Sequence, residues 1–276
     1  MDRSRQSFRT VLTFVAIFGL LIAVNFLPPD TSLDQVQSSG VLRACVPNQY
    51  PPLVVPNSDT PGIDVEILQA VADDLGVRLD LNTNSAMGRD FNPRNWRVTR
   101  AQCAVLAGGV VASQTTRSFL ETAPPHLETG WAIVVPDTLG TLDGRTVGFF
   151  AGISGLDRIS LSRFLRDQGT EVTTVNSSSE LVAGLQTGRF DAGVTEALMA
   201  RQIAGDNEWD VQWLPEELGR YPVVLGLWKG DLTFKRAVVS SLRSLRRAGR
   251  IDAIFDHYGI APIEETCGPC MPLGNG

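Results

Sequence analysis

Two charged residues follow short apolar runs in this chain, and together they could hold a zwitterion. Arg117 closes the stretch Gly109–Arg117, which comes just after the apolar run Ala104–Ala107. Glu196 comes just after a second apolar run, Phe190–Val194. If these runs are strands of open α/β sheets, a ligand is expected beyond their carboxyl ends. An arginine there suits a carboxylate and a glutamate suits an ammonium group, so the pattern predicts a site for an amino acid.

The composition limits the classes of protein that this chain could represent. It has 276 residues, enough for one large domain or two lobes, with 43% hydrophobic and 20% charged residues, so extensive disorder is not expected. The net charge is -6, and the basic run Arg243–Arg250 is typical of the polar face of a helix, so nucleic-acid binding is not expected. The two histidines, His126 and His257, have no ligand-spaced neighbours, so we expect neither a metal site nor a cofactor.

The N-terminal segment, residues 1–30, predicts export. Three arginines within the first ten positions precede the apolar run Val11–Leu27. Positive charge before an apolar run places the N-terminus in the cytoplasm. The run is intermediate in length between a signal-peptide core and a short transmembrane span. No small-residue cleavage site follows closely, so we expect an uncleaved anchor of residues 11–27 that tethers a periplasmic body to the inner membrane. A cleaved signal peptide is the alternative.

Four cysteines in an exported chain suggest disulfides, whose pairing the sequence leaves open. Cys45 lies in an apolar run, where a buried thiol and a bridge to Cys103 are both compatible with the pattern. Cys267 and Cys270 are close enough to pair locally, and their Cys-Gly-Pro-Cys spacing is similar to that of thioredoxins. A redox dithiol needs a following helix to stabilise the thiolate. Only Met-Pro-Leu-Gly-Asn-Gly follows, so redox catalysis is not expected.

The hydrophobic pattern predicts two successive arrays of strands and helices. The first array has strands at 41–46, 77–81, 104–107 and 130–135 and a helix at 62–75. The second has strands at 146–150, 171–175 and 190–194 and helices at 156–168, 177–186 and 197–204. A strand at 223–228 and helices at 234–248 and 250–258 follow. Alternation of strands with helices predicts an α/β fold with two lobes, each a mostly parallel sheet flanked by helices.

Several short motifs in a fixed order give this chain a family resemblance over about residues 40–260. It resembles the extracytoplasmic (periplasmic) solute-binding proteins of the amino-acid type, family 3, which are associated with ABC transporters. The motifs are Gly40-Val-Leu-Arg43, Asn48-Gln-Tyr-Pro-Pro52, Gly62-Ile-Asp-Val-Glu66, Thr116-Arg117, Glu128-Thr-Gly130, Val147-Gly-Phe-Phe-Ala-Gly152, Gly188-Arg-Phe-Asp-Ala192 and Gly249-Arg-Ile-Asp-Ala-Ile-Phe255.

The resemblance implies a type II clamshell with two hinge strands, near residues 134–136 and 222–225. Ligand would close the two lobes by a hinge motion. The expected division of the chain is a tether at 31–37, lobe 1 at 38–133 plus 224–262, lobe 2 at 134–223, and a C-terminal tail with two cysteines at 263–276.

The resemblance also implies roles for individual residues. Arg117 corresponds to the arginine that binds the ligand α-carboxylate, which a guanidinium can do through two parallel hydrogen bonds. Ser154 corresponds to a hydroxyl on the same carboxylate, helped by free amides at a helix start. Glu196 stands where the family usually has an aspartate for the α-ammonium. The alternatives are a surface arginine, a simple helix cap and a solvated helix-start carboxylate, respectively.

Three further residues complete the predicted ligand-binding set. Tyr50 and Phe150 correspond to aromatic residues that line the ligand side chain, with core packing as the alternative for both. Ser113, within the same stretch as Arg117, is added as a ligand contact.

These observations favour a non-catalytic protein that binds an amino acid or related zwitterion and delivers it to an ABC importer. The first alternative is an enzyme similar to cyclohexadienyl dehydratases, with Glu196 as general acid. That role requires burial and a raised pKa, whereas beside Arg117 the glutamate is expected to stay ionised. The second alternative is a partner protein of a periplasmic quinoprotein dehydrogenase, because relatives of that kind look like this chain around Cys45 and Cys103. The sequence does not fix the ligand side chain or the oligomeric state.

Overall fold

The structure is a computed structural model that describes residues 13–19, 30–87, 93–137, 141–151 and 156–259. The chain divides into two units, Met1–Thr31 and Ser32–Gly276. In the first unit residues 13–19 are helical. None of the helices within the described ranges has the length and apolar character needed to cross a membrane. Cys267, Cys270 and the rest of the predicted tail lie outside the described residues.

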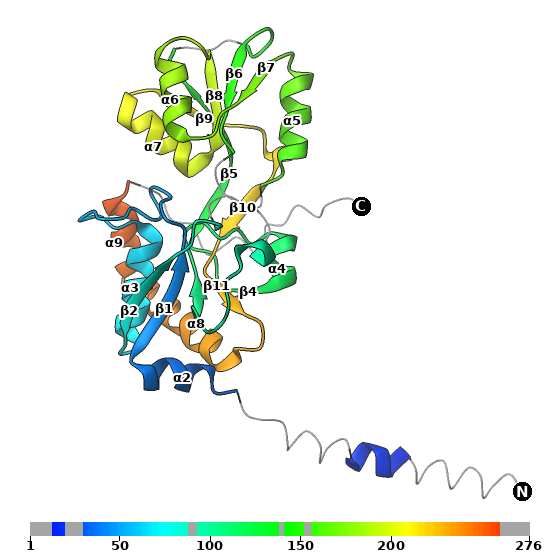
Figure 1. Cartoon of the computed structure of the whole chain (residues 1–276), viewed down its shortest axis with the longest axis vertical. Coiled ribbons are helices and arrows are strands. Elements are labelled where there is room, and N and C mark those ends of the chain that lie inside the picture. The colour runs from blue at the N-terminus through cyan, green and yellow to red at the C-terminus, as the bar shows by residue number, and fades with distance from the viewer. Residues whose placement is uncertain (1–12, 20–29, 88–92, 138–140, 152–155, 260–276) are drawn as a thin grey trace, which may run out of the picture. The chain divides into compact units, whose positions relative to one another are not determined.

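The second unit contains two mixed sheets (Figure 1). The first has the strand order β2-β1-β3-β11-β4, in which β1 is parallel to β2 and β3 while β11 is antiparallel to β3 and β4. Its strands are β1 Val41–Val46, β2 Arg78–Thr83, β3 Val105–Leu106, β4 Leu120–Thr122 and β11 Gly226–Trp228. Its helices are α2 Ser32–Ser39, α3 Ile63–Asp74, α4 Gln114–Phe119, α8 Leu232–Arg247 and α9 Arg250–His257, with a short 3-10 helix at Pro93–Trp96.

The second sheet has the order β10-β5-β8-β6-β7, with β9 paired to β5. Its strands are β5 Leu127–Val135, β6 Thr146–Phe149, β7 Glu171–Thr174, β8 Ala192–Glu196, β9 Asp210–Trp213 and β10 Arg220–Val223. Its helices are α5 Arg158–Asp167, α6 Ser178–Gln186 and α7 Ala197–Asn207, with a 3-10 turn at Glu216–Leu218. Strand β6 is parallel to β7 and β8. The predicted fold class, α/β with two sheets flanked by helices, is therefore confirmed. The sheets are mixed and not mostly parallel, because β11 in the first sheet and β5 in the second run antiparallel to their neighbours.

The chain passes between the two sheets twice, from β4 to β5 and from β10 to β11. Hydrogen bonds join the two crossing segments, because Ala123 N donates to Leu225 O at 2.9 Å and His126 N donates to Val223 O at 3.1 Å. The boundary drawn from the sequence at 223/224 lies between β10 and β11. The boundary drawn at 133/134 lies within β5, all of which pairs with strands of the second sheet.

Helix α2 occupies the segment that the sequence analysis assigned to a tether, residues 31–37. Val36 is buried and Leu33 packs against the main core cluster. The Ser32 hydroxyl lies 3.0 Å from the Thr233 hydroxyl and accepts from Phe234 N at 3.2 Å. Two apolar residues three positions apart share one helix face, and that face was overlooked because the segment is otherwise polar.

A disulfide joins Cys45 in β1 to Cys103, two residues before β3. Both cysteines are buried, and Trp228 Nε1 donates to Cys103 O at 2.7 Å. The sequence left open a buried thiol or a bridge to Cys103 for Cys45, and the structure contains the bridge. It fixes the start of β3 against β1, and thereby the segment that leads from β3 to α4.

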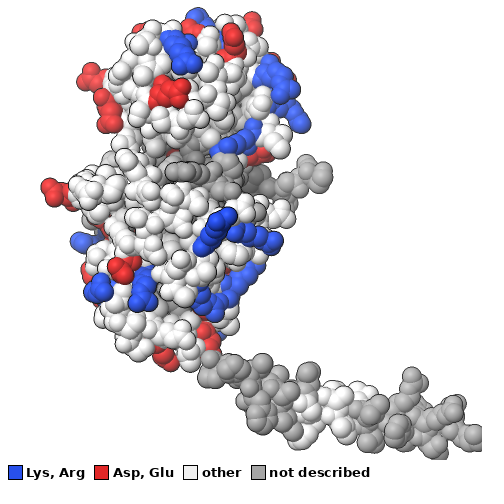
Figure 2. Space-filling view, in the orientation of Figure 1, with Lys and Arg blue, Asp and Glu red and all other residues white. Residues whose placement is uncertain are grey.

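The visible surface carries charges of both signs, with basic side chains gathered over α5 (Figure 2). Helix α5 supplies Arg158, Arg163 and Arg166.

Candidate functional site

Glu196 is the last residue of β8 and the N-cap of α7. Because the strand leads directly into the helix, the side chain folds back onto the first helical turn. Leu198 N donates to Oε1 at 2.9 Å and Met199 N donates to Oε2 at 3.2 Å. These are amides that a helix leaves without internal partners. Glu196 is thus a helix-start carboxylate, but it is fully buried rather than solvated.

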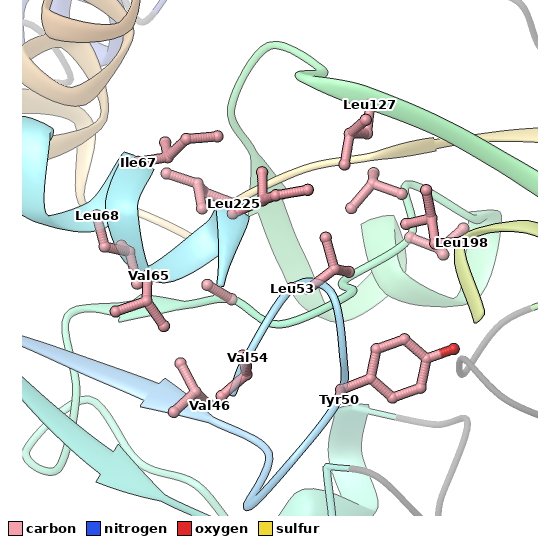
Figure 3. Packing of buried hydrophobic residues seen from close by; sticks show 14 of the residues in the cluster. Val46, Tyr50, Leu53, Val54, Val65, Ile67, Leu68, Leu127, Leu198 and Leu225 are labelled. Atoms are coloured by element: carbon pink, nitrogen blue, oxygen red, sulfur yellow. The ribbon is translucent and has the colours of Figure 1, made fainter. Parts of the chain in front are cut away.

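Two hydroxyls complete the surroundings of this carboxylate. Thr129, in β5, donates from Oγ1 to Glu196 Oε1, and Tyr50 donates from its hydroxyl to Oε2 at 3.0 Å. Tyr50 lies in the loop after β1, so its donor comes from the side of the first sheet. Its ring belongs to the same core cluster as Leu53 and Leu198, and Figure 3 shows Leu53 near the ring. The carboxylate therefore receives four donors, which come from α7, from β5 of the second sheet and from the loop after β1 of the first sheet.

Burial raises the pKa of Glu196 to about 7, from an ordinary value of 4.5. The hydrogen bonds from Leu198, Met199 and Tyr50 and the positive charge of Arg201 lower the pKa but do not cancel the desolvation. The expectation that Arg117 would keep this group in its ordinary ionised state is therefore not met. Near neutral pH the carboxyl exists in both forms, and its ionised form can hold a cation.

Arg117 and Ser113 belong to the same short helix, α4. Ser113 is its N-cap, because the Ser113 hydroxyl accepts from Thr116 N at 3.1 Å and lies 3.1 Å from the Thr116 hydroxyl. Arg117 is half-buried in the last turn of the helix. Ser113 therefore fixes the start of the helix that carries Arg117.

A buried Asp64–His126 pair fixes the turn that leads toward α4. Asp64 lies in the first turn of α3 and is fully buried. Its Oδ2 accepts from Gly108 N at 2.6 Å and from Gly109 N at 3.2 Å, and its Oδ1 lies 2.7 Å from His126 Nε2. Both glycines have positive φ, and a Cβ on Gly108 would lie 2.3 Å from Pro47 Cδ. The turn therefore requires glycine there.

The same pair reaches the crossing segments between the sheets. His126 precedes β5 directly, and its backbone is bonded to Val223 at the other crossing. Between the turn and α4, Val224 N donates to Val110 O and Ala112 N donates to Pro222 O, both at 2.9 Å. The segment leading to Arg117 is thus hydrogen-bonded to the residues that connect the two sheets.

The remaining predicted residues lie as follows. Phe150 comes directly after β6, donates from its amide to Val194 O at 3.0 Å and packs half-buried against the core cluster that contains Tyr50. Ser154 lies outside the described residues. Of the predicted set, the structure brings Tyr50 and Glu196 into contact. Within the described ranges, no group of three His, Cys, Asp or Glu side chains is placed to hold a metal ion.

Sequence reasoning missed two parts of this site. Thr129 was quoted only as part of a motif, and nothing in the sequence marks it as a partner of Glu196, 67 positions away. Asp64 could have been found, because an acidic residue between Ile63 and Val65, in a helix with an apolar face, must either be exposed or have buried partners.

Comparison with known proteins agrees with this fold. Residues 42–261 match the bacterial extracellular solute-binding proteins, family 3. The chain is 23% identical over 265 residues to the L-cystine-binding protein TcyJ of Escherichia coli (strain K12), covering 92% of this chain and 95% of that protein.

Solved structures with the same fold include an ancestral cationic amino acid solute-binding protein, with a TM-score of 0.67 and 18% identity over 82% of this chain and 99% of that one. A mutant of ArgBP from T. maritima gives a TM-score of 0.63 and 22% identity over 83% and 99%. The protein AbpA from Streptococcus pneumoniae, bound to L-arginine, gives a TM-score of 0.63 and 19% identity over 81% and 96%.

The Asp64 network predicts a large effect on stability. Asp64→Ala leaves two glycine amides and His126 Nε2 without their buried acceptor, and each unsatisfied group costs roughly 1–3 kcal/mol. We expect the free energy of unfolding, measured by urea denaturation, to fall by at least about 3 kcal/mol. Asp73→Ala is the matched control, because Asp73 lies on the same helix but is exposed. Equal effects of the two substitutions would contradict the assigned network.

The raised pKa of Glu196 predicts a pH-dependent stability. Between about 4.5, its ordinary value, and about 7 the folded protein binds a proton that the unfolded chain does not. The free energy of unfolding should therefore fall as the pH rises through this range, by about 1.4 kcal/mol for each pKa unit. We expect Glu196→Gln, compared with the wild type by urea denaturation from pH 5 to pH 8, to remove this part of the slope. If the free energies of unfolding of the wild type and Glu196→Gln changed with pH in parallel, the raised pKa of Glu196 would be refuted.

Proposed function

The chain belongs to the bacterial extracellular solute-binding proteins, family 3, and from this premise we propose that it binds an amino acid or related zwitterion between its two sheets and delivers it to an ABC importer. The observation that carries the proposal is the buried Glu196 carboxylate, at the junction of β8 and α7, with donors from β5 and from the loop after β1. A carboxylate that is withdrawn from water attracts an ammonium group more strongly than an exposed one does.

The ligand carboxylate is assigned to Arg117. The half-buried guanidinium can form two parallel hydrogen bonds with a carboxylate. The support for this role is the way the helix is held: Ser113 caps it, and the Asp64–His126 pair fixes the turn before it. A binding arginine on a fixed helix loses less entropy when it engages its ligand. Ser154 and Phe150 keep their predicted roles, on the ligand carboxylate and on its side chain.

Delivery to a membrane partner follows from the family and the N-terminal segment. The family is extracellular, and residues 1–30 carry arginines ahead of an apolar run, which is the pattern of a segment that directs export. We propose that residues 32–259 act in the periplasm and present the ligand to an ABC permease. If residues 11–27 anchor the protein, the mature protein remains with the membrane fraction. If these residues are cleaved off, the mature protein is released from that fraction.

One observation favours a second candidate, a dehydratase that uses Glu196 as its general acid. Burial raises the pKa of Glu196 to about 7, which is the property that such an acid needs. The four protein donors stabilise the ionised carboxylate, which is the form that pairs with a cation and not the form that donates a proton. Incubation with prephenate, followed by assay for phenylpyruvate, decides the matter. Turnover lost in Glu196→Gln would establish the enzyme.

The binding function is tested by calorimetric titration of the purified full-length protein with L-arginine, L-cystine, L-glutamine and L-histidine. We expect one or more to bind, and Arg117→Ala to weaken that binding by at least about 30-fold, the value of a charge-assisted bidentate contact. Arg236→Ala, an exposed arginine on α8, is the matched control and should leave the affinity unchanged. Affinity should also fall as the pH drops below about 7, because protonated Glu196 cannot pair with ammonium.

A folded protein that binds none of these ligands would contradict the proposal and favour the partner-protein alternative. Equal losses in Arg117→Ala and Arg236→Ala would remove Arg117 from the site.

A further inference from the structure

The Glu196 carboxylate has no acceptor position left for a ligand. A carboxylate offers about four lone-pair positions on its two oxygens. Thr129 Oγ1 and Leu198 N occupy Oε1, while Tyr50 and Met199 N occupy Oε2. The group is fully buried, so no position faces bulk water. An ammonium group can therefore reach this carboxylate only by displacing one of the four donors.

Three of these donors belong to the second-sheet half of the molecule, and one comes from the first-sheet side. Leu198 and Met199 are in the first turn of α7, which grows directly out of β8 at Glu196. Thr129 lies in β5, which pairs with β8 from Trp131 to Val134. Among the described residues, Tyr50 is the sole donor to Glu196 from the first-sheet side. Any separation of the two sheets breaks the Tyr50 bond first and leaves the other three in place.

We propose that the Tyr50 hydroxyl is an internal competitor for the ligand ammonium: it occupies Glu196 Oε2, is displaced on binding, and so lowers the affinity of the site for amino acids. This inference rests on the proposed function, in which Glu196 takes the ammonium. It gives Tyr50 a role distinct from lining the ligand side chain. The Tyr50 hydroxyl lowers the affinity for the ligand instead of raising it. When no ammonium is bound, it supplies a hydrogen bond to the buried carboxylate.

The competition also has a consequence for release. When the ligand leaves, the hydroxyl restores the fourth hydrogen bond, so Glu196 does not retain an unmet acceptor position. The free-energy difference between the ligand-bound and ligand-free site is reduced by the strength of that bond. A protein that must pass its ligand to a membrane partner benefits from such a limit on affinity.

The test is a cycle of four titrations on the full-length protein. The tightest-binding of the four amino acids named above is titrated into the wild type and into Tyr50→Phe. The same molecule without its α-ammonium group (5-guanidinopentanoate in place of L-arginine, for example) is titrated into both. Phenylalanine keeps the ring, which belongs to the core cluster, and removes only the hydroxyl.

We expect Tyr50→Phe to bind the amino acid more tightly than the wild type by about tenfold, the value of a hydrogen bond to a charged group. The affinity for the des-amino analogue should be unchanged, because that ligand displaces nothing. Tyr258→Phe is the matched control. The Tyr258 hydroxyl also donates to a glutamate, Glu66 Oε1 at 2.8 Å, and is not one of the four donors of Glu196, so its removal leaves those four in place. The Tyr258→Phe substitution should leave the affinities for the amino acid and for its des-amino analogue unchanged.

The other outcomes separate this inference from the proposed function. Weaker binding of both ligands to Tyr50→Phe, or a loss confined to the amino acid, would mean that the hydroxyl supports binding, and would overturn the competition alone. Equal affinity of Tyr50→Phe for the amino acid and its des-amino analogue would show that Glu196 does not take the ammonium. That result, or the failure of all four amino acids to bind, overturns both.

Discussion

The burial of one carboxylate, Glu196, is the constraint on which the rest of this structure depends. Removing a charge from water is costly unless donors replace the water. Two of its four donors are amides that open α7, so the junction of β8 and α7 is built around the carboxyl group. The third fixes β5 and the fourth holds the loop after β1. One side chain therefore sets the relative positions of a strand, a helix and a loop 146 residues away in sequence.

A second buried carboxylate, that of Asp64, positions the part of the proposed site that binds the ligand carboxylate. Asp64 holds the Gly108–Gly109 turn and contacts His126 at the crossing between the sheets. The backbone from Val110 to Ala112 is hydrogen-bonded to the second crossing. The helix that carries Arg117 is consequently attached to the segments that would act as hinges. In the proposed mechanism, motion of the two sheets and placement of the ligand carboxylate are therefore physically connected.

The periodic elements of the fold could be predicted from the sequence, whereas the partners of its buried charges could not. Strand β1 was predicted with its observed limits because it is an apolar run interrupted only by Arg43, and α6 to within one residue because serines precede it. Helix α2 was missed because two buried positions in a polar segment give a weak pattern. Residues 130–135 were recognised as a strand, but their pairing with the second sheet depends on partners far along the chain. Likewise, Arg117 was expected to act on Glu196, whereas Arg201, one turn along α7, supplies the positive charge.

The central claim is that Glu196 is a buried carboxyl group with a raised pKa that becomes the counter-ion of an amino-acid ammonium. The most direct measurement is a carbon-13 NMR titration of the side-chain carboxyl groups of glutamate-labelled protein, with Glu196→Gln used to assign the resonance. The account predicts that Glu196 titrates near pH 7 in the free protein and stays ionised to lower pH when the amino acid is bound, because the adjacent positive charge favours the carboxylate. An ordinary glutamate pKa in the free protein, or a titration curve that the ligand does not move, would contradict it.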